Sequence, residues 1–272
     1  MAIASVRSFL MTDAFYVPDG DRFAPTAWTR GPWDREAQHA GPPAALVARA
    51  IEGLEPAGQL QVARFTFEVL RPIPLTELRI AARVVRPGRR VQFAEASIVD
   101  ERGEVARASV WQIRPSVESV PTAGQEPPPF DAPVDSPPEP VFDPPWEGES
   151  YFTAMEWRGA RGAVFEPGPA AVWMRARIPL VPGEEPSPLT RVLVVADSGN
   201  GISSVSSPLD YLFINTELTV HLFRLPVGEW VCLDAVSRID PSGVGVAEST
   251  LWDEIGRIGR ANQALLVAPR ER

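Results

Sequence analysis

The stretch Ile98-Val-Asp-Glu-Arg-Gly-Glu-Val-Ala-Arg-Ala-Ser109 recurs near the end of the chain as Leu251-Trp-Asp-Glu-Ile-Gly-Arg-Ile-Gly-Arg-Ala-Asn262. The two copies are related by one constant offset of 153 positions, which also aligns Thr66 with Thr219 and Arg71 with Arg224. An ungapped offset over this length indicates an internal duplication. The alternative is that two unrelated hairpins share the turn sequence Asp-Glu-x-Gly.

Each half of the chain also contains one short apolar segment that begins like a helix. Gly41-Pro-Pro precedes the segment Ala44–Ile51, and Ser187-Pro-Leu-Thr precedes Arg191–Ala196. Proline fits the first turn of a helix, and serine is a good N-terminal cap. We expect the second helix to end at Gly199-Asn-Gly201. A helix that is apolar on nearly all sides must be buried.

Alternating strand patterns follow each helix. They occur at positions 64–69 and 217–222, and then at Leu78–Val85, Val91–Val99, Val105–Ile113, Trp230–Arg238, Val244–Trp252 and Arg257–Val267. Turn sequences containing Pro and Gly separate several of these runs. Each half is therefore predicted to be an antiparallel meander of class α+β that wraps around one central helix. This is the arrangement of the hotdog fold, and two fused copies make a double hotdog.

Composition limits the class of protein. The chain has 272 residues, a formal net charge of −9 and a single cysteine, Cys232. We expect a cytoplasmic protein without a membrane span, and the acidic balance argues against a general nucleic-acid binder. A stretch rich in proline separates the halves. We therefore predict an N-terminal domain at 1–114, a linker at 115–149 and a C-terminal domain at 150–272.

Several stretches resemble the bacterial acyl-CoA thioesterase II (TesB-like) family of double-hotdog proteins. They are His39-Ala-Gly-Pro-Pro-Ala-Ala-Leu-Val-Ala48, Ala196-Asp-Ser-Gly-Asn-Gly-Ile-Ser203, Ile214-Asn-Thr-Glu-Leu-Thr-Val-His-Leu222, Gly228-Glu-Trp230 and Ala261-Asn-Gln-Ala-Leu-Leu266. The resemblance covers nearly the whole chain. It implies hydrolysis of an acyl-CoA thioester to a free acid and coenzyme A.

The resemblance also implies a site in which a carboxylate, a hydroxyl residue and a glutamine hold one water molecule. Asp197 matches the carboxylate and Gln263 the glutamine. The third position is occupied by Asn215, where the family often has Thr or Ser. Thr219 carries a hydroxyl four residues later on the same strand face. Register favours Asn215 and chemistry favours Thr219, so both are candidates.

The residues themselves support the first two assignments. Asp197 lies at the end of an apolar helix, where desolvation raises the pKa of a carboxyl group and makes it a better base near neutral pH. A negative charge at the C-terminal end of a helix also opposes the helix dipole. An acid with no role beyond contact with solvent is therefore not expected at this position. Gln263 lies on an apolar strand face and needs partners for its amide, although a core glutamine bound to backbone would satisfy the same pattern.

Three further residues are candidates for substrate binding: Gly41, His39 and His221. Gly41 begins the first helix, and its backbone N–H could polarise the thioester carbonyl, since Pro42 and Pro43 have none. It could also simply permit a tight turn. His39 is a general-base or structural candidate, and His221 shares a strand face with Asn215.

We therefore predict a thioester hydrolase of lipid metabolism that needs no metal or cofactor and takes acyl-CoA as substrate. Two alternatives stay open, a non-catalytic acyl-thioester-binding protein and an enoyl-thioester hydratase using Asp34 and His39. The two sheets should join edge to edge, because fusion replaces a dimer and covers two exposed strands. Homo-oligomers of such double-hotdog subunits are a further expectation.

Overall fold

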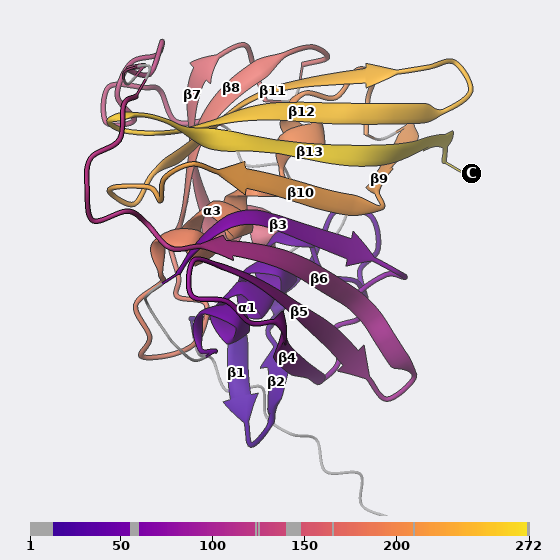
Figure 1. Ribbon diagram of the computed structural model, residues 1–272. Helices are drawn as coiled ribbons and strands as arrows, with labels where there is room; N and C mark the ends of the chain where they lie inside the picture. The colour runs from indigo at the N-terminus through magenta and orange to yellow at the C-terminus, as the bar shows by residue number, and fades with distance from the viewer. Residues whose placement is uncertain are drawn as a thin grey trace, which may run out of the picture.

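A computed structural model describes residues 13–54, 60–122, 124, 126–139, 148–164, 166–208 and 210–270. One antiparallel sheet of 13 strands curls around the helices (Figure 1), in the order β1-β2-β4-β5-β6-β3-β10-β13-β12-β11-β8-β7, with β9 pairing to β13. This architecture confirms the predicted double hotdog.

The elements divide between the two halves. The N-terminal half contains β1 (Tyr16–Asp19), β2 (Arg22–Pro25), the 3₁₀ turn η1 (Ala27–Thr29), α1 (Gly41–Glu52), β3 (Gln61–Val69), β4 (Leu78–Arg86), β5 (Val91–Asp100) and β6 (Gly103–Ile113). The C-terminal half contains α2 (Tyr151–Ala154), β7 (Met155–Arg161), β8 (Ala170–Ala176), α3 (Pro188–Ala196), α4 (Gly199–Ile202), β9 (Tyr211–Asn215), β10 (Glu217–Leu222), β11 (Val231–Ile239), β12 (Val244–Asp253) and β13 (Gly256–Pro269).

The duplication is visible in the strand register. Phe67 pairs with Ala108 between β3 and β6, and their copies Val220 and Ala261 pair between β10 and β13. The halves meet where β3 pairs antiparallel with β10, and there Thr66 lies opposite its own copy, Thr219. Their hydroxyl oxygens are 3.2 Å apart and the two positions differ by 153. An approximate twofold axis therefore passes through this pair, as in a symmetric dimer.

The two central helices run antiparallel against each other. Ser187 caps α3, because its Oγ accepts a hydrogen bond from Thr190 N at 3.1 Å. Gly41 lies so close to α3 that an added Cβ atom would overlap the carbonyl oxygen of Val194. The N-terminal end of α1 is thereby held against the C-terminal end of α3, and this contact positions the candidate site.

The structure adds elements that the sequence patterns did not predict. In each half a pair of strands precedes the central helix, β1–β2 and β7–β8, so the helix lies within the meander rather than before it. Gly199 to Gly201 do not simply end α3, because they form the short helix α4. Each pair joins the rest of the sheet through a distant strand, β2 through β4 and β8 through β11, and local sequence does not specify that pairing.

Part of the predicted linker packs on the C-terminal half. Glu139 N donates to Trp157 O at 3.1 Å and Gly159 N donates to Pro137 O at 2.9 Å, so this segment extends the edge at β7. Trp173 Nε1 also donates to Asp131 O at 3.0 Å. Positions 140–147 of the linker lie outside the described residues, and the boundaries 1–114, 115–149 and 150–272 stay a prediction.

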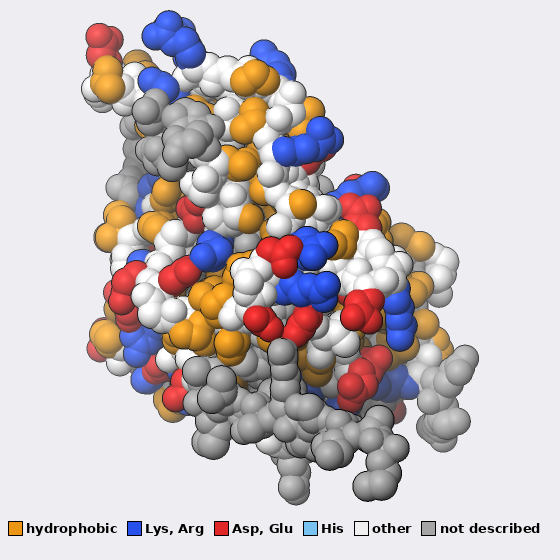
Figure 2. Space-filling model, turned by 90° about the horizontal axis from the view of Figure 1, so that it is seen from below, with side chains coloured by type: hydrophobic (Ala, Val, Ile, Leu, Met, Phe, Trp, Pro, Cys, Tyr) orange, Lys and Arg blue, Asp and Glu red, His pale blue; other side chains and the backbone are white. Residues whose placement is uncertain are grey.

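On the face seen in Figure 2, acidic and basic side chains are interspersed rather than gathered by sign. Among the described residues, none of the helices is both long enough and apolar enough to span a bilayer.

Candidate active site

A cavity of about 410 Å³ lies where the two halves meet. Its walls are largely apolar, and residues of both halves contribute to them, among them Trp33, Ile73, Phe152, Trp157, Leu212 and Ile214. One part of the wall is polar and is formed by His39, Asp197, Ser198, Asn200 and Asn215. A largely apolar cavity with a few converging polar groups is typical of a small-molecule site.

Asp197 is the acid of this polar wall. It follows directly after α3, faces the N-terminal end of α1 and is only 4% exposed. Its Oδ1 accepts hydrogen bonds from Asn215 Nδ2 at 2.8 Å and from Gln263 Nε2 at 3.1 Å. Burial raises the pKa of Asp197 to about 7, although these bonds and the backbone N–H groups of Ala40 and Gly41 act to lower it. The carboxyl group can therefore exchange a proton near neutral pH.

His39 contacts the same carboxyl group from the other half of the chain. Its Nδ1 lies 3.2 Å from Asp197 Oδ2. Burial lowers the pKa of His39 to about 3, so the ring is neutral and this contact is a hydrogen bond rather than an ion pair. A neutral imidazole has one proton. With the proton on Nδ1 the ring can donate to an ionised Asp197, whereas the hydrogen bond from Gly41 N to Nδ1 at 3.2 Å requires the proton to lie on Nε2.

Tyr151, a residue that sequence reasoning missed, supports this contact. The ring of Tyr151 stacks on His39 with centroids 3.7 Å apart and planes 6° apart. The Tyr151 hydroxyl donates to Val194 O at 2.9 Å and lies 2.9 Å from Ser198 Oγ. Tyr151 thus joins the His39 ring to the end of α3. Only the capping pattern Ser150–Thr153 marks this segment in the sequence, and it indicates a helix start, not a site.

Gln263 contacts Asp197 from the side away from the cavity. Its Nε2 donates both to Asp197 O at 3.0 Å and to Asp197 Oδ1 at 3.1 Å, while its Oε1 accepts from Asn200 N at 3.0 Å. The side chain is 2% exposed and lies behind Asp197, outside the cavity wall. Gln263 therefore contacts the carboxyl group, and its two amide hydrogens are already bonded within the protein.

The structure separates the two candidates for the third position. Asn215, at the end of β9, lines the cavity and contacts Asp197. Thr219 lies at the junction of the halves, where its Oγ1 contacts Thr66 and donates to Glu217 Oε2 at 2.7 Å. Thr219 is thus not part of the cluster, because the strand carries its side chain to the outer face of the junction.

His221 and Gly41 also differ from expectation. His221 lies further along β10, paired in register with Arg64 and Arg260, and is not in the cavity wall. Desolvation and these two charges lower its pKa. Gly41 is at the site, but its N–H points toward His39 Nδ1 at 3.2 Å and toward Asp197. Its backbone therefore supports the carboxyl group instead of facing the cavity.

The other ends of the two helices form a counterpart of this site. Glu52 is the last residue of α1 and its Oε2 accepts a hydrogen bond from Ser187, the cap of α3, at 2.7 Å. The copies of Asn215 and Gln263 at the offset of 153 are Val62 and Val110, which are both buried and cannot donate. The counterpart keeps an acid but lacks the amides that surround Asp197.

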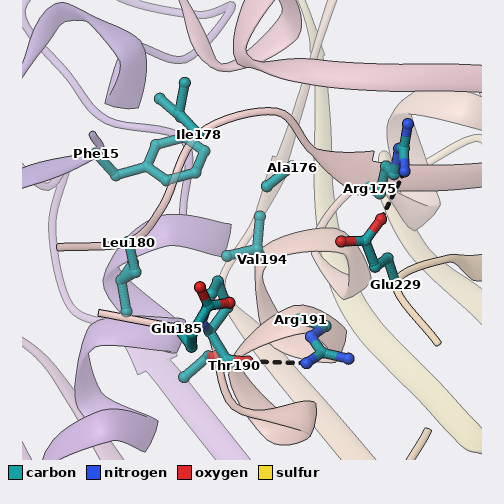
Figure 3. A pocket seen from close by; sticks show the side chains of 11 residues that line it. Phe15, Arg175, Ala176, Ile178, Leu180, Glu185, Thr190, Arg191, Val194 and Glu229 are labelled. Atoms are coloured by element: carbon teal, nitrogen blue, oxygen red, sulfur yellow. Dashed lines mark hydrogen bonds and ion pairs between the residues drawn. The ribbon is translucent and has the colours of Figure 1, made fainter. Parts of the chain in front are cut away.

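A second hollow of about 70 Å³ lies beside the first turns of α3 (Figure 3). Three of its charged side chains are already bonded, because Arg175 Nη1 contacts Glu229 at 2.6 Å and Arg191 Nη2 donates to Pro186 O at 3.1 Å. Of these two hollows, the cavity beside Asp197 is therefore the better candidate. Among the described residues, no group of three or more His, Cys, Asp or Glu side chains could hold a metal ion.

Known structures share this fold. A hotdog-fold protein from Alicyclobacillus acidocaldarius matches with a TM-score of 0.72 at 18% identity, covering 96% of this chain and 97% of its own. A protein described as a thioesterase from Novosphingobium aromaticivorans gives 0.71 at 20%, with 93% and 98% covered. The acyl-CoA thioesterase II TesB2 from Mycobacterium marinum gives 0.62 at 12%, with 93% and 94% covered.

The sequence itself matches two family models in chain order. Residues 29–113 match the acyl-CoA thioesterase N-terminal domain, and residues 133–267 match the acyl-CoA thioesterase C-terminal domain. A search of curated proteins found no match. The second model begins within the stretch predicted as a linker, in agreement with the packing of Pro137 and Glu139 on β7. With both domains matched in order, the chain belongs to the acyl-CoA thioesterase family and is a thioester hydrolase.

Proposed function

We propose that this protein hydrolyses acyl-CoA by means of a water molecule that Asp197 activates. The observation that carries the proposal is the buried carboxyl group with a pKa of about 7 in the polar wall of an otherwise apolar cavity. In its ionised form Asp197 can accept a proton from water, and its pKa near neutrality is well suited to general-base catalysis.

Asp197 alone can carry the proton that moves from water to the leaving sulfur. The water oxygen bonds to the thioester carbon while one of its protons moves to Asp197, and the carbonyl electrons move to oxygen. Collapse of the tetrahedral intermediate breaks the carbon–sulfur bond and releases the coenzyme A thiolate. The proton on Asp197 then moves to the sulfur, which restores the ionised carboxylate. His39 can contact Asp197 in both states, because its neutral ring can donate or accept at Nδ1.

The substrate follows from the family and from the cavity wall. The apolar wall that includes Trp33, Phe152 and Trp157 is suited to an uncharged acyl group. A hydratase using Asp34 and His39 is less well supported, because the Asp34 carboxylate accepts from Glu36 N at 2.9 Å while His39 faces Asp197. The cytoplasmic location, the role in lipid metabolism and assembly into homo-oligomers stay predictions.

The test is steady-state release of free thiol from a panel of acyl-CoA substrates of different chain length. Wild-type protein is compared with Asp197→Asn, which keeps the shape of the side chain but cannot accept the water proton. Glu52→Gln is the matched control, because Glu52 holds the equivalent position at the end of the other helix.

We expect Asp197→Asn to lose about 100-fold or more in kcat, within the range of general-base catalysis, and Glu52→Gln to stay within about twofold of wild type. Wild-type protein that binds acyl-CoA without releasing thiol would instead indicate a binding protein. Hydration of an enoyl-CoA without thiol release would indicate a hydratase.

A further inference from the structure

The groups around Asp197 indicate which residue contacts the carbonyl oxygen of the substrate. We propose that Asn215 donates its second amide N–H to this oxygen, while Gln263 acts only as a positioning residue for Asp197. The inference rests on the proposed thioester hydrolysis and assigns the donor that stabilises negative charge on oxygen during attack.

Gln263 has no donor left for substrate. One amide has two N–H groups, and those of Gln263 are bonded to the backbone oxygen and to Oδ1 of Asp197. Its carbonyl oxygen Oε1 accepts a hydrogen bond from Asn200 N. Gly199 permits this close packing, because a Cβ atom at that position would lie only 3.0 Å from Oε1. The side chain therefore fixes Asp197 from behind the cavity wall.

The hydroxyl of Ser198 is also engaged. Tyr151 has one hydroxyl proton, and it is donated to Val194 O at 2.9 Å. In the contact of 2.9 Å between Tyr151 and Ser198, the proton therefore comes from Ser198. Ser198 lies in the cavity wall, but its one hydroxyl hydrogen is used in this contact and is not available to the substrate.

The Nδ1 atom of His39 is engaged within the protein. It lies 3.2 Å from Asp197 Oδ2, and Gly41 N donates to it at 3.2 Å. The backbone N–H groups of Ala40 and Gly41 point at Asp197 as well.

Asn215 both lines the cavity and bonds directly to the carboxyl group of Asp197. Its Nδ2 has two hydrogens, and one of them is donated to Asp197 Oδ1 at 2.8 Å. The second can donate to a carbonyl oxygen next to the attacking water. A Ser or Thr hydroxyl at this position has a single hydrogen and could not make both contacts, so the amide gives this chain a donor that a hydroxyl would not.

The test compares Asn215→Thr and Asn215→Ala with Gln263→Leu. Two non-hydrolysable probes are used: an S-alkyl-CoA thioether, which has no carbonyl, and a trifluoromethyl ketone analogue of acyl-CoA, whose hydrate mimics the tetrahedral intermediate. The thioether reports whether each variant still folds and binds. Wild-type thiol release is measured first, and its absence would reject the proposed function rather than this inference.

We expect both Asn215 variants to lose on the order of 100-fold in kcat and in affinity for the ketone, the usual effect of removing one such donor, and to bind the thioether within about threefold of wild type. Gln263→Leu should lower kcat and move the pH midpoint upward, since its hydrogen bond lowers the pKa of Asp197. It should keep the preference of wild type for ketone over thioether. The assignment is wrong if Asn215→Thr binds the ketone as tightly as wild type, or if Gln263→Leu loses as much ketone affinity as Asn215→Thr.

Discussion

His39 of the N-terminal half places its Nδ1 3.2 Å from Oδ2 of Asp197 in the C-terminal half. The acid and its imidazole partner are thus brought together only when the two halves pack with α1 antiparallel to α3. The junction of β3 and β10 holds this arrangement in one chain. The site is therefore a product of the fused fold and not of either half alone.

The rate of hydrolysis should depend on the ionisation of Asp197. Because burial raises its pKa to about 7, we expect kcat/KM to rise as the pH increases through about 7 and to level off above it. Asn215→Ala should move this midpoint upward, since the lost hydrogen bond lowers the pKa in wild type. The measurement is a pH profile of thiol release corrected for spontaneous hydrolysis. A profile that is flat from about pH 5 to 9 would exclude Asp197 as the titrating base.

Stability should depend on the same group with a defined sign. Between about pH 4 and 7 the folded protein holds a proton on Asp197 that the unfolded chain has released, so this residue reduces the free energy of unfolding as the pH rises. We expect Asp197→Asn to gain stability relative to wild type between pH 5 and pH 8, by at most roughly 4 kcal/mol, because burial raises the pKa of Asp197 in the folded protein to about 7. Urea unfolding at both pH values measures this, and a difference that does not change with pH would contradict the raised pKa.

His39 changes the free energy of unfolding with pH in the opposite direction to Asp197, so its effect must be measured separately. Its pKa is lowered to about 3 in the folded state, so its contribution to stability is present above the unfolded pKa of about 6.5 and is lost as the pH falls toward 3. The double variant His39→Gln with Asp197→Asn should therefore show less pH dependence of unfolding from pH 4 to 8 than either single variant.

Gly41 is predicted to be required for the contact between the helices. A methyl group in Gly41→Ala would overlap Val194 O, and such overpacking typically costs about 1–3 kcal/mol in unfolding free energy. Activity should fall as well, because Asp197 follows the displaced end of α3. Gly53→Ala is the matched control, since its added Cβ would have no contact nearer than 3.5 Å. Equal stability of the two variants in urea unfolding would show that the close approach is not needed.

The fold could be predicted from the sequence because its main signal is repeated. The register in the second half reproduces that of the first, for example Ile80 with Ile98 and Leu233 with Leu251. The strands before each helix could not be predicted in the same way. β7 pairs with β8, β8 pairs with β11, and no local turn pattern connects this pair to β11.

The candidate site was predictable only in part. The sequence predicts Asp197 as the base, because an acid at the end of an apolar helix is desolvated. Alignment of the strand at 214–222 with the family favours Asn215 as its neighbour. The role of Gln263 was not predictable, because the sequence places it on an apolar face but does not show that its amide is bonded to Asp197. The sequence does not predict Tyr151 as a site residue, because its contact with His39 depends on how the two halves pack.

The most direct test of water activation by Asp197 is a single turnover in water enriched in oxygen-18, with enzyme in excess over acyl-CoA. If water attacks the thioester directly, the released acid contains one heavy oxygen after the first turnover and Asp197 contains none. If Asp197 instead attacks and forms an anhydride that water opens at the aspartyl carbon, the acid is unlabelled and the heavy oxygen is found in the peptide that contains Asp197. Mass spectrometry of the acid and of that peptide measures both. We predict labelled acid and unlabelled Asp197, and the reverse result would contradict the mechanism.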